Sequence, residues 1–208
     1  FIAALMLAVC GCQSTYYKTM EAFGHHKRDL LVSRVQDARD AQEVAQEQFQ
    51  SAFDKLKAVV SVPAGKLEEK YRQVNGELEE SEARAKAVTN RIRDVEKVAK
   101  ALFKEWNSEL GQYTSENLRR TSEEKLEQTQ QRYARLIDAM KRAESKIAPV
   151  IGAYRDQVLF LKHNLNAQAI ASLHGELASV QADIASLIRE METSTAEADA
   201  FIKDMGQE

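Results

Sequence analysis

A repeated spacing of apolar residues constrains this chain more than any other feature of its sequence. From Leu31 onward, apolar or small residues recur in alternating steps of four and three, and the pattern continues with interruptions to Met205. A period of 3.5 residues places these positions on one stripe of an α-helix and is typical of left-handed coiled coils. The sequence therefore predicts long amphipathic helices that bury their stripes against one another.

Three interruptions divide the pattern into four predicted helices. The first, Ser61-Val62-Pro63-Ala64-Gly65, combines a proline with a glycine and ends a helix. The rhythm then lapses at 114–120, and Thr121 with Glu124 forms a capping-box pattern that predicts the start of the third helix. The last interruption is His163-Asn164-Leu165-Asn166, whose asparagines suit a helix end. The predicted helices cover approximately residues 31–60, 67–113, 122–164 and 167–205.

Several residues modify the predicted stripes. Gln42 is a polar residue within the first stripe, and Trp106 lies on the second stripe, where we interpret it as a core residue. In the third helix the phase shifts by one residue after Tyr154, a stutter that unwinds a supercoil, and Pro149 is expected to kink the helix or leave a carbonyl unpaired. Further apolar residues widen the stripes and favour a bundle over a two-stranded coil: Phe53, Phe103, Ile137, Ile151, Phe160, Ile188 and Ile202.

Composition agrees with an all-helical fold. The 208 residues include only 8 Gly and 2 Pro, too few for the turns of a β-sandwich or a Rossmann sheet. Short reversals between long helices favour antiparallel neighbours. We therefore predict an all-α fold for residues 31–208, an elongated antiparallel coiled coil or helical bundle of about four long helices. One bundle and two hairpins laid together both agree with the pattern.

The first twelve residues are typical of an export signal. Residues 1–9 are an apolar run too short to span a bilayer, and Cys10, Gly11 and Cys12 follow it. Gly11-Cys12 resembles the end of a bacterial lipobox, which predicts that Cys12 is acylated. We expect residues 1–11 to be a lipoprotein signal peptide truncated at its start, and residues 12–30 to be the anchor and linker. Gln13 after the acceptor resembles the pattern sorted to the outer membrane.

A short basic cluster follows the predicted anchor. It consists of His25, His26, Lys27 and Arg28, which we single out as candidates for membrane-proximal contact with lipid headgroups. The alternative interpretation is a solvated helix start.

Catalytic patterns were sought by residue type and spacing. The glycines lack the spacing of a phosphate-binding loop. None of the four histidines stands three residues after a glutamate, the spacing of di-metal sites in helical bundles. The net charge of −3 arises from interleaved acidic and basic residues, which disfavours nucleic acid as a partner. We therefore predict a protein that is not an enzyme, with no catalytic residue, no metal site and no cofactor.

Six segments together resemble a family of Gram-negative bacterial lipoproteins of unknown function, with helical, coiled-coil character. The resemblance covers nearly the whole chain, and it implies an envelope lipoprotein without an established activity or cofactor. Its segments are Gly11-Cys12-Gln13-Ser14, His26-Lys27-Arg28-Asp29, Leu118-Arg119-Arg120, Tyr154-Arg155-Asp156-Gln157-Val158, Leu161-Lys162-His163-Asn164-Leu165-Asn166-Ala167 and Ala196-Glu197-Ala198-Asp199-Ala200-Phe201.

These features lead to a functional hypothesis and two alternatives. We expect a non-enzymatic, lipid-anchored protein that faces the periplasm, in the outer membrane rather than the inner, and acts as a structural, scaffold or partner-binding rod. Its expected partners are the membrane and other envelope proteins, and homo-oligomerisation stays open. The first alternative is a membrane-associated stress or remodelling protein that binds lipid headgroups. The second is a hydrolase or ligand carrier with a pocket around Trp106.

Overall fold

A computed structural model describes residues 27–59, 66–164 and 167–206, and four long α-helices occupy nearly all of this part. A short 3-10 helix, η2, follows α3 at Leu110–Gln112. The described residues contain no strand, which confirms the predicted all-α class. The predicted reversal at 61–65 lies outside the described residues. The α-helices are α2 (Lys27–Val59), α3 (Leu67–Glu109), α4 (Glu116–His163) and α5 (Ala167–Gly206).

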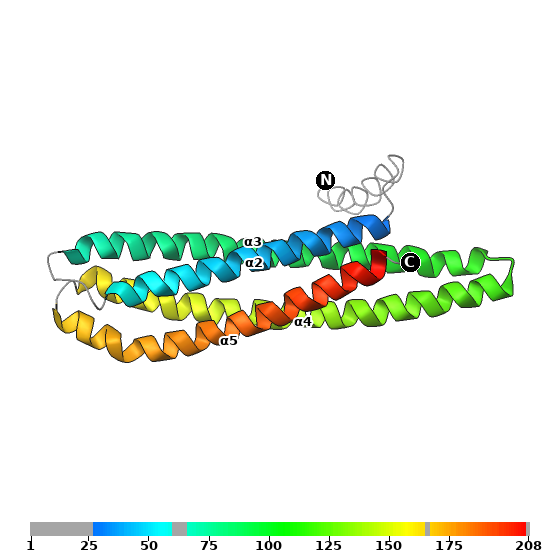
Figure 1. The fold of residues 1–208 in the computed structure, drawn as a ribbon. Coiled ribbons are helices and arrows are strands. Elements are labelled where there is room, and N and C mark those ends of the chain that lie inside the picture. Colours follow the sequence, from blue (N-terminus) through cyan, green and yellow to red (C-terminus); the bar gives the residue numbers. More distant parts are fainter. Residues whose placement is uncertain (1–26, 60–65, 165–166, 207–208) are drawn as a thin grey trace, which may run out of the picture.

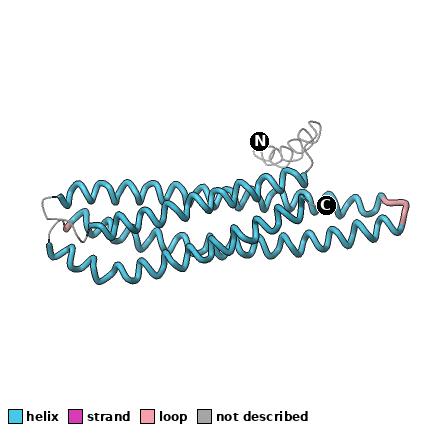
Figure 2. The backbone as a smooth tube through the Cα atoms, in the orientation of Figure 1, coloured by secondary structure: helices cyan, strands magenta, loops and turns pink. Residues whose placement is uncertain are grey.

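The four helices form an elongated antiparallel bundle (Figure 1). Helix α2 packs against α3 and α5, and helix α4 packs against the same two neighbours. Each helix runs opposite to the next one along the chain, as the smooth trace in Figure 2 also shows. The predicted elongated bundle is therefore confirmed. The contacts of α2 with α5 and of α3 with α4 join the two hairpins into one body.

The apolar stripes face the interior of the bundle. All nine predicted stripe positions of α2, from Leu31 to Val59, are buried. Buried residues beside the stripes include Phe53 and Ile151, as the widened pattern predicted. The prediction for Phe160 is wrong, because this side chain is 37% exposed. A broad stripe lets each helix contact two neighbours at once, which explains a four-helix bundle.

Two buried polar side chains interrupt the core between α2 and α5. Gln42 and Ser194 are both fully buried, and neither the Gln42 amide nor the Ser194 hydroxyl has a hydrogen-bond partner among the described residues. They lie in one section of the bundle, since the Arg39 guanidinium donates to Asp199 at 2.7 Å nearby on the same two helices. Buried polar groups without partners destabilise a fold, so this section is the weak point of the core.

The start of α4 differs from its prediction. The helix begins at Glu116, and its N-cap is Ser115, whose Oγ accepts a hydrogen bond from the Leu118 backbone at 3.4 Å. Thr121 lies inside the helix and donates to the Asn117 carbonyl at 3.0 Å. The capping box predicted at Thr121 is therefore wrong. The apolar rhythm lapses at 116–120 because these helical residues are exposed, and not because the helix is absent.

Helix α4 continues through Pro149 without a break. Proline lacks the N–H that would bond the Ser145 carbonyl, and Pro149 lies on the exposed face, where water can satisfy that carbonyl. Beyond it the buried residues Tyr154, Val158 and Leu161 follow the shifted phase predicted from the sequence. The helix ends at His163, where the Asn164 side chain donates to the Phe160 carbonyl at 3.0 Å.

Replacing Gln42 by leucine should stabilise the bundle. The substitution removes two unpaired buried polar atoms, so we expect the free energy of unfolding to rise by about 1 to 3 kcal/mol. Chemical denaturation monitored by helical circular dichroism measures it. Gln36→Leu on the exposed face of the same helix is the matched control, with an expected change within about 0.5 kcal/mol. A Gln42→Leu chain less stable than the parent would contradict this account of the core.

Candidate functional site

Of the predicted membrane-proximal residues, the structure describes Lys27 and Arg28, which lie at the start of α2. Cys12, His25 and His26 lie outside the described residues. The Lys27 ammonium lies 2.8 Å from a Glu105 carboxylate oxygen on α3, and the Lys27 side chain is only 10% exposed. The Arg28 guanidinium donates to the backbone carbonyl of Met205 near the end of α5. These two cations therefore contact the bundle and fix the start of α2 against two other helices.

Helices α3 and α4 extend past this end of the bundle. Glu105 contacts the first residue of α2, and Arg132 contacts Asp204 near the end of α5 at 3.5 Å. Among the described residues, only α3, η2 and α4 continue beyond these contacts, as a two-helix hairpin (Figure 1). We call residues 106–131 the hairpin extension. The 16 residue-to-residue steps from Glu116 to Arg132 correspond to a length of about 24 Å at the helical rise per residue.

The hairpin extension is held together by a small polar and aromatic cluster. The Trp106 indole Nε1 donates to the Ser122 hydroxyl at 2.8 Å, and the Tyr113 hydroxyl lies 3.3 Å from the same oxygen. Trp106 is half-buried and does not belong to the fully buried core, so its assignment as a core residue is wrong. The reason is positional, because Trp106 lies where the chain has two helices and no longer four. Thr129 is buried here although the sequence analysis missed it.

The outer end of the extension exposes apolar surface. Tyr113 is 43% exposed and Leu118 is 58% exposed, and Leu118 is the most exposed large hydrophobic residue of the described part. The sequence signal for this end is the lapse of the apolar rhythm at 114–120, which the sequence analysis interprets as a break between two helices. A segment without an apolar stripe between two long helices indicates a protruding hairpin as well as a helix break.

Charges surround this apolar end in nearly balanced numbers. The extension carries five glutamates against Arg119, Arg120 and Lys125, a formal charge of −2. An Arg119 nitrogen lies 2.6 Å from a Glu116 carboxylate oxygen. This hydrogen bond and the charge of Arg119 lower the pKa of Glu116, and the same hydrogen bond and the charge of Glu116 raise the pKa of Arg119. The extension thus carries neither a strongly basic nor a strongly acidic field.

In the four-helix part, Tyr154 joins three helices. Its hydroxyl on α4 lies 3.0 Å from the Ala52 carbonyl on α2 and 3.4 Å from the Val74 carbonyl on α3. Burial, followed by the nearby negative charge of Glu77, raises the pKa of Tyr154. The buried hydroxyl therefore stays protonated and serves as a donor at a helix junction. Tyr154 also lies in one of the segments that carry the family resemblance.

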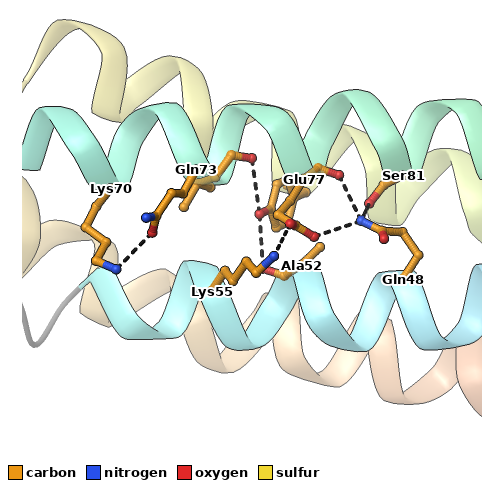
Figure 3. A network of polar contacts seen from close by, with 9 residues as sticks. Gln48, Ala52, Lys55, Lys70, Gln73, Glu77 and Ser81 are labelled. Atoms are coloured by element: carbon orange, nitrogen blue, oxygen red, sulfur yellow. Dashed lines mark hydrogen bonds and ion pairs between the residues drawn. The ribbon is translucent and has the colours of Figure 1, made fainter.

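A polar network continues from this junction along the α2–α3 boundary (Figure 3). The Glu77 carboxylate accepts a hydrogen bond from the Gln48 amide at 2.9 Å and pairs with Lys55. The Gln48 amide also lies 3.5 Å from the Ser81 hydroxyl. These contacts join side chains of α2 and α3 and fix the register of the two helices. We therefore assign the network a structural role.

The remaining chemistry of the described residues is sparse. The larger hollows are open surface grooves, one of 710 Å³ along α2 beside Ile188 and one of 650 Å³ between α3 and α4. Among the described residues, no three His, Cys, Asp or Glu side chains are grouped closely enough to hold a metal ion. His163 is exposed at the end of α4, and the His174 side chain is outside the described set. Within the same residues, no helix combines the length and apolar character needed to cross a membrane.

Comparison with known families gives a match that covers residues 16–205 and is described as "Protein of unknown function (DUF2959)". The chain belongs to this family. The match includes all four described helices of this DUF2959 protein, so the bundle and its hairpin extension are parts of the family domain. Comparison with curated proteins and with solved structures finds no match.

Tyr154→Phe should weaken the junction of three helices. Removing the buried hydroxyl eliminates its hydrogen bond to a carbonyl, and we expect a loss of about 1 kcal/mol in unfolding free energy. Chemical denaturation provides the measurement. Tyr113→Phe is the control, since that hydroxyl is exposed, and should change the free energy by less than about 0.5 kcal/mol. Equal effects of the two substitutions would contradict the assigned role of Tyr154.

Stability should fall at alkaline pH because Tyr154 is buried and Tyr133 is partly buried. Burial, with a smaller contribution from Glu96, raises the pKa of Tyr133 from 10.0 to about 12. The folded chain then holds this proton more tightly than the unfolded chain does, so the stabilisation is complete below pH 10 and is lost as the pH rises toward 12. Denaturation curves across this range should show the decline, and Tyr133→Phe should make it shallower. An unchanged slope in the variant would show that Tyr133 titrates normally.

Proposed function

We propose that this protein is a non-enzymatic, lipid-anchored component of the bacterial cell envelope that acts as a structural, scaffold or partner-binding rod. The observation that carries the proposal is the rod-shaped bundle, in which α2 begins with Lys27 and Arg28 at one end of the four-helix part. An acyl group on Cys12 would therefore tether the rod near one end and leave its length free.

The dimensions of the bundle suit a spacer or scaffold. Helix α4 has 48 residues, which corresponds to about 72 Å at the helical rise per residue. Most of its outer surface carries paired charges, such as Arg155 with Glu82 at 2.6 Å and Lys141 with Glu96 at 3.2 Å. A long, charged, well-packed rod offers a large surface for protein partners.

The location in this proposal rests on the N-terminal sequence. Several acyl chains on one cysteine anchor a protein far more firmly than a single chain does. Gln13 after the acceptor favours the outer membrane, with the rod facing the periplasm. Homo-oligomerisation is compatible with the same surface.

The alternative proposal, a stress or remodelling protein that binds lipid headgroups through the basic cluster, has less support. Two of the four cluster residues, Lys27 and Arg28, direct their charged groups to Glu105 and to the Met205 carbonyl. Cations engaged in this way contribute less to headgroup binding than solvated ones. His25 and His26 are left to carry that interaction.

Acylation of Cys12 tests the proposal directly. The gene with its natural signal should be expressed in a Gram-negative host supplied with labelled palmitate. We expect the label and membrane fractionation in the parent chain and in Cys10→Ser, the matched control, and the loss of both in Cys12→Ser. A parent chain that carries no label would contradict the lipid-anchored assignment.

A further inference from the structure

We propose that the outer end of the hairpin extension, residues 113–118, rests on the surface of the bilayer that holds the anchor. The rod then stands with the α3–α4 hairpin on the membrane and the α4–α5 connection away from it. This inference rests on the proposed acylation of Cys12. The surface that residues 113–118 would contact is a phospholipid bilayer with electrically neutral, zwitterionic headgroups.

The geometry brings the anchor and the hairpin to the same end of the molecule. Helix α2 starts beside Glu105, at the level where the extension begins. The extension continues about 24 Å beyond that level, calculated from the rise of α4. A chain segment with the 15 residue-to-residue steps from Cys12 to Lys27 has a maximum span of about 50 Å. The tether is therefore long enough for the outer end to reach the bilayer in which Cys12 would sit.

The side chains at the outer end suit a membrane–water interface. Leu118 is 58% exposed and Tyr113 is 43% exposed, so both present apolar surface to the surroundings. Aromatic side chains with one polar atom partition to the interfacial region of bilayers. Tyr113 is oriented by its contact with Ser122, which also accepts the Trp106 hydrogen bond. The outer end is thus a preformed apolar cap on a rigid hairpin.

The charges around the cap determine the type of surface that it fits. The charged residues around the cap are Glu109, Glu116, Arg119 and Arg120, with a formal charge of zero, so the cap as a whole is neither attracted nor repelled by a charged lipid surface. The ion pair between Glu116 and Arg119 neutralises the charges nearest to Leu118. A zwitterionic surface accepts apolar side chains without a net repulsive field, and we therefore assign the contact to neutral phospholipids.

The chain offers an intrinsic probe, since Trp106 is its only tryptophan. Trp106 is retained, because its hydrogen bond to Ser122 holds the extension together, and the parent chain gives its background emission and quenching for subtraction. Leu118→Trp adds a probe at the outer end of the extension, and Phe160→Trp adds one at an exposed site far along α4. Both chains are produced with the natural signal, acylated chains are verified by mass, and they are reconstituted into phosphatidylcholine vesicles containing brominated phosphatidylcholine. Brominated acyl chains quench only a tryptophan that lies close to the bilayer.

We expect quenching and a blue shift for the Leu118→Trp chain, and neither for the Phe160→Trp chain. Replacing part of the neutral lipid by anionic lipid should leave the quenching at low salt unchanged, and quenching seen only with anionic lipid would overturn the assignment to neutral phospholipids. Acylated, vesicle-bound chains without quenching at the Leu118 site would overturn the bilayer contact, leave the outer end to a protein partner, and leave the proposed function intact. Equal quenching at both sites would overturn it as well, because the rod would then lie flat. Chains that never become acylated would overturn both proposals.

Discussion

The burial of four apolar stripes against one another is the interaction on which the structure depends. A single helix of this length gains little stability in water without a partner for its apolar face. In this chain every long helix has two neighbours, and stripe residues such as Leu31, Ile92, Met140 and Leu187 are fully buried between them. The antiparallel arrangement of the helices and the elongated shape of the bundle both follow from these contacts.

Polar groups inside the bundle divide into two kinds with opposite effects. Tyr154 is buried with partners and joins three helices. Gln42 and Ser194 are buried without partners in the described part of the chain. A polar residue at a stripe position lowers stability but can specify which alignment of helices is adopted. The core thus combines one well-satisfied junction with one section in which alignment is favoured over stability.

The sequence predicted the architecture because a repeat of 3.5 residues is a direct signature of mutual helix burial. It predicted all nine stripe positions of α2 and the phase shift after Tyr154 correctly. It failed where that burial stops. Ser115, and not Thr121, caps α4, because the first turns of that helix lie in the two-helix extension, where no stripe is required. Trp106 is partly exposed for the same reason. Phe160 is exposed for a different one, because it lies on the outer face of α4 beside the buried Val158 and Leu161.

The candidate site was less predictable than the fold. Sequence analysis pointed to a basic cluster, yet Lys27 and Arg28 bind the bundle, and the surface at the outer end of the hairpin emerged only from the relative lengths of the helices. Those lengths depend on where α2 and α5 end beside α3 and α4, which is a tertiary property. A local pattern of residues carries little information about it.

Small-angle X-ray scattering of the unacylated chain, residues 13–208, tests the central claim that these helices form one extended rod. For a monomer whose length is set by the 48 residues of α4, we predict a radius of gyration of at least about 22 Å and a rod-like distance distribution. A compact globule of this size would have a radius of gyration of about 17 Å. That value, for a monomer with intact helical content, would contradict the account.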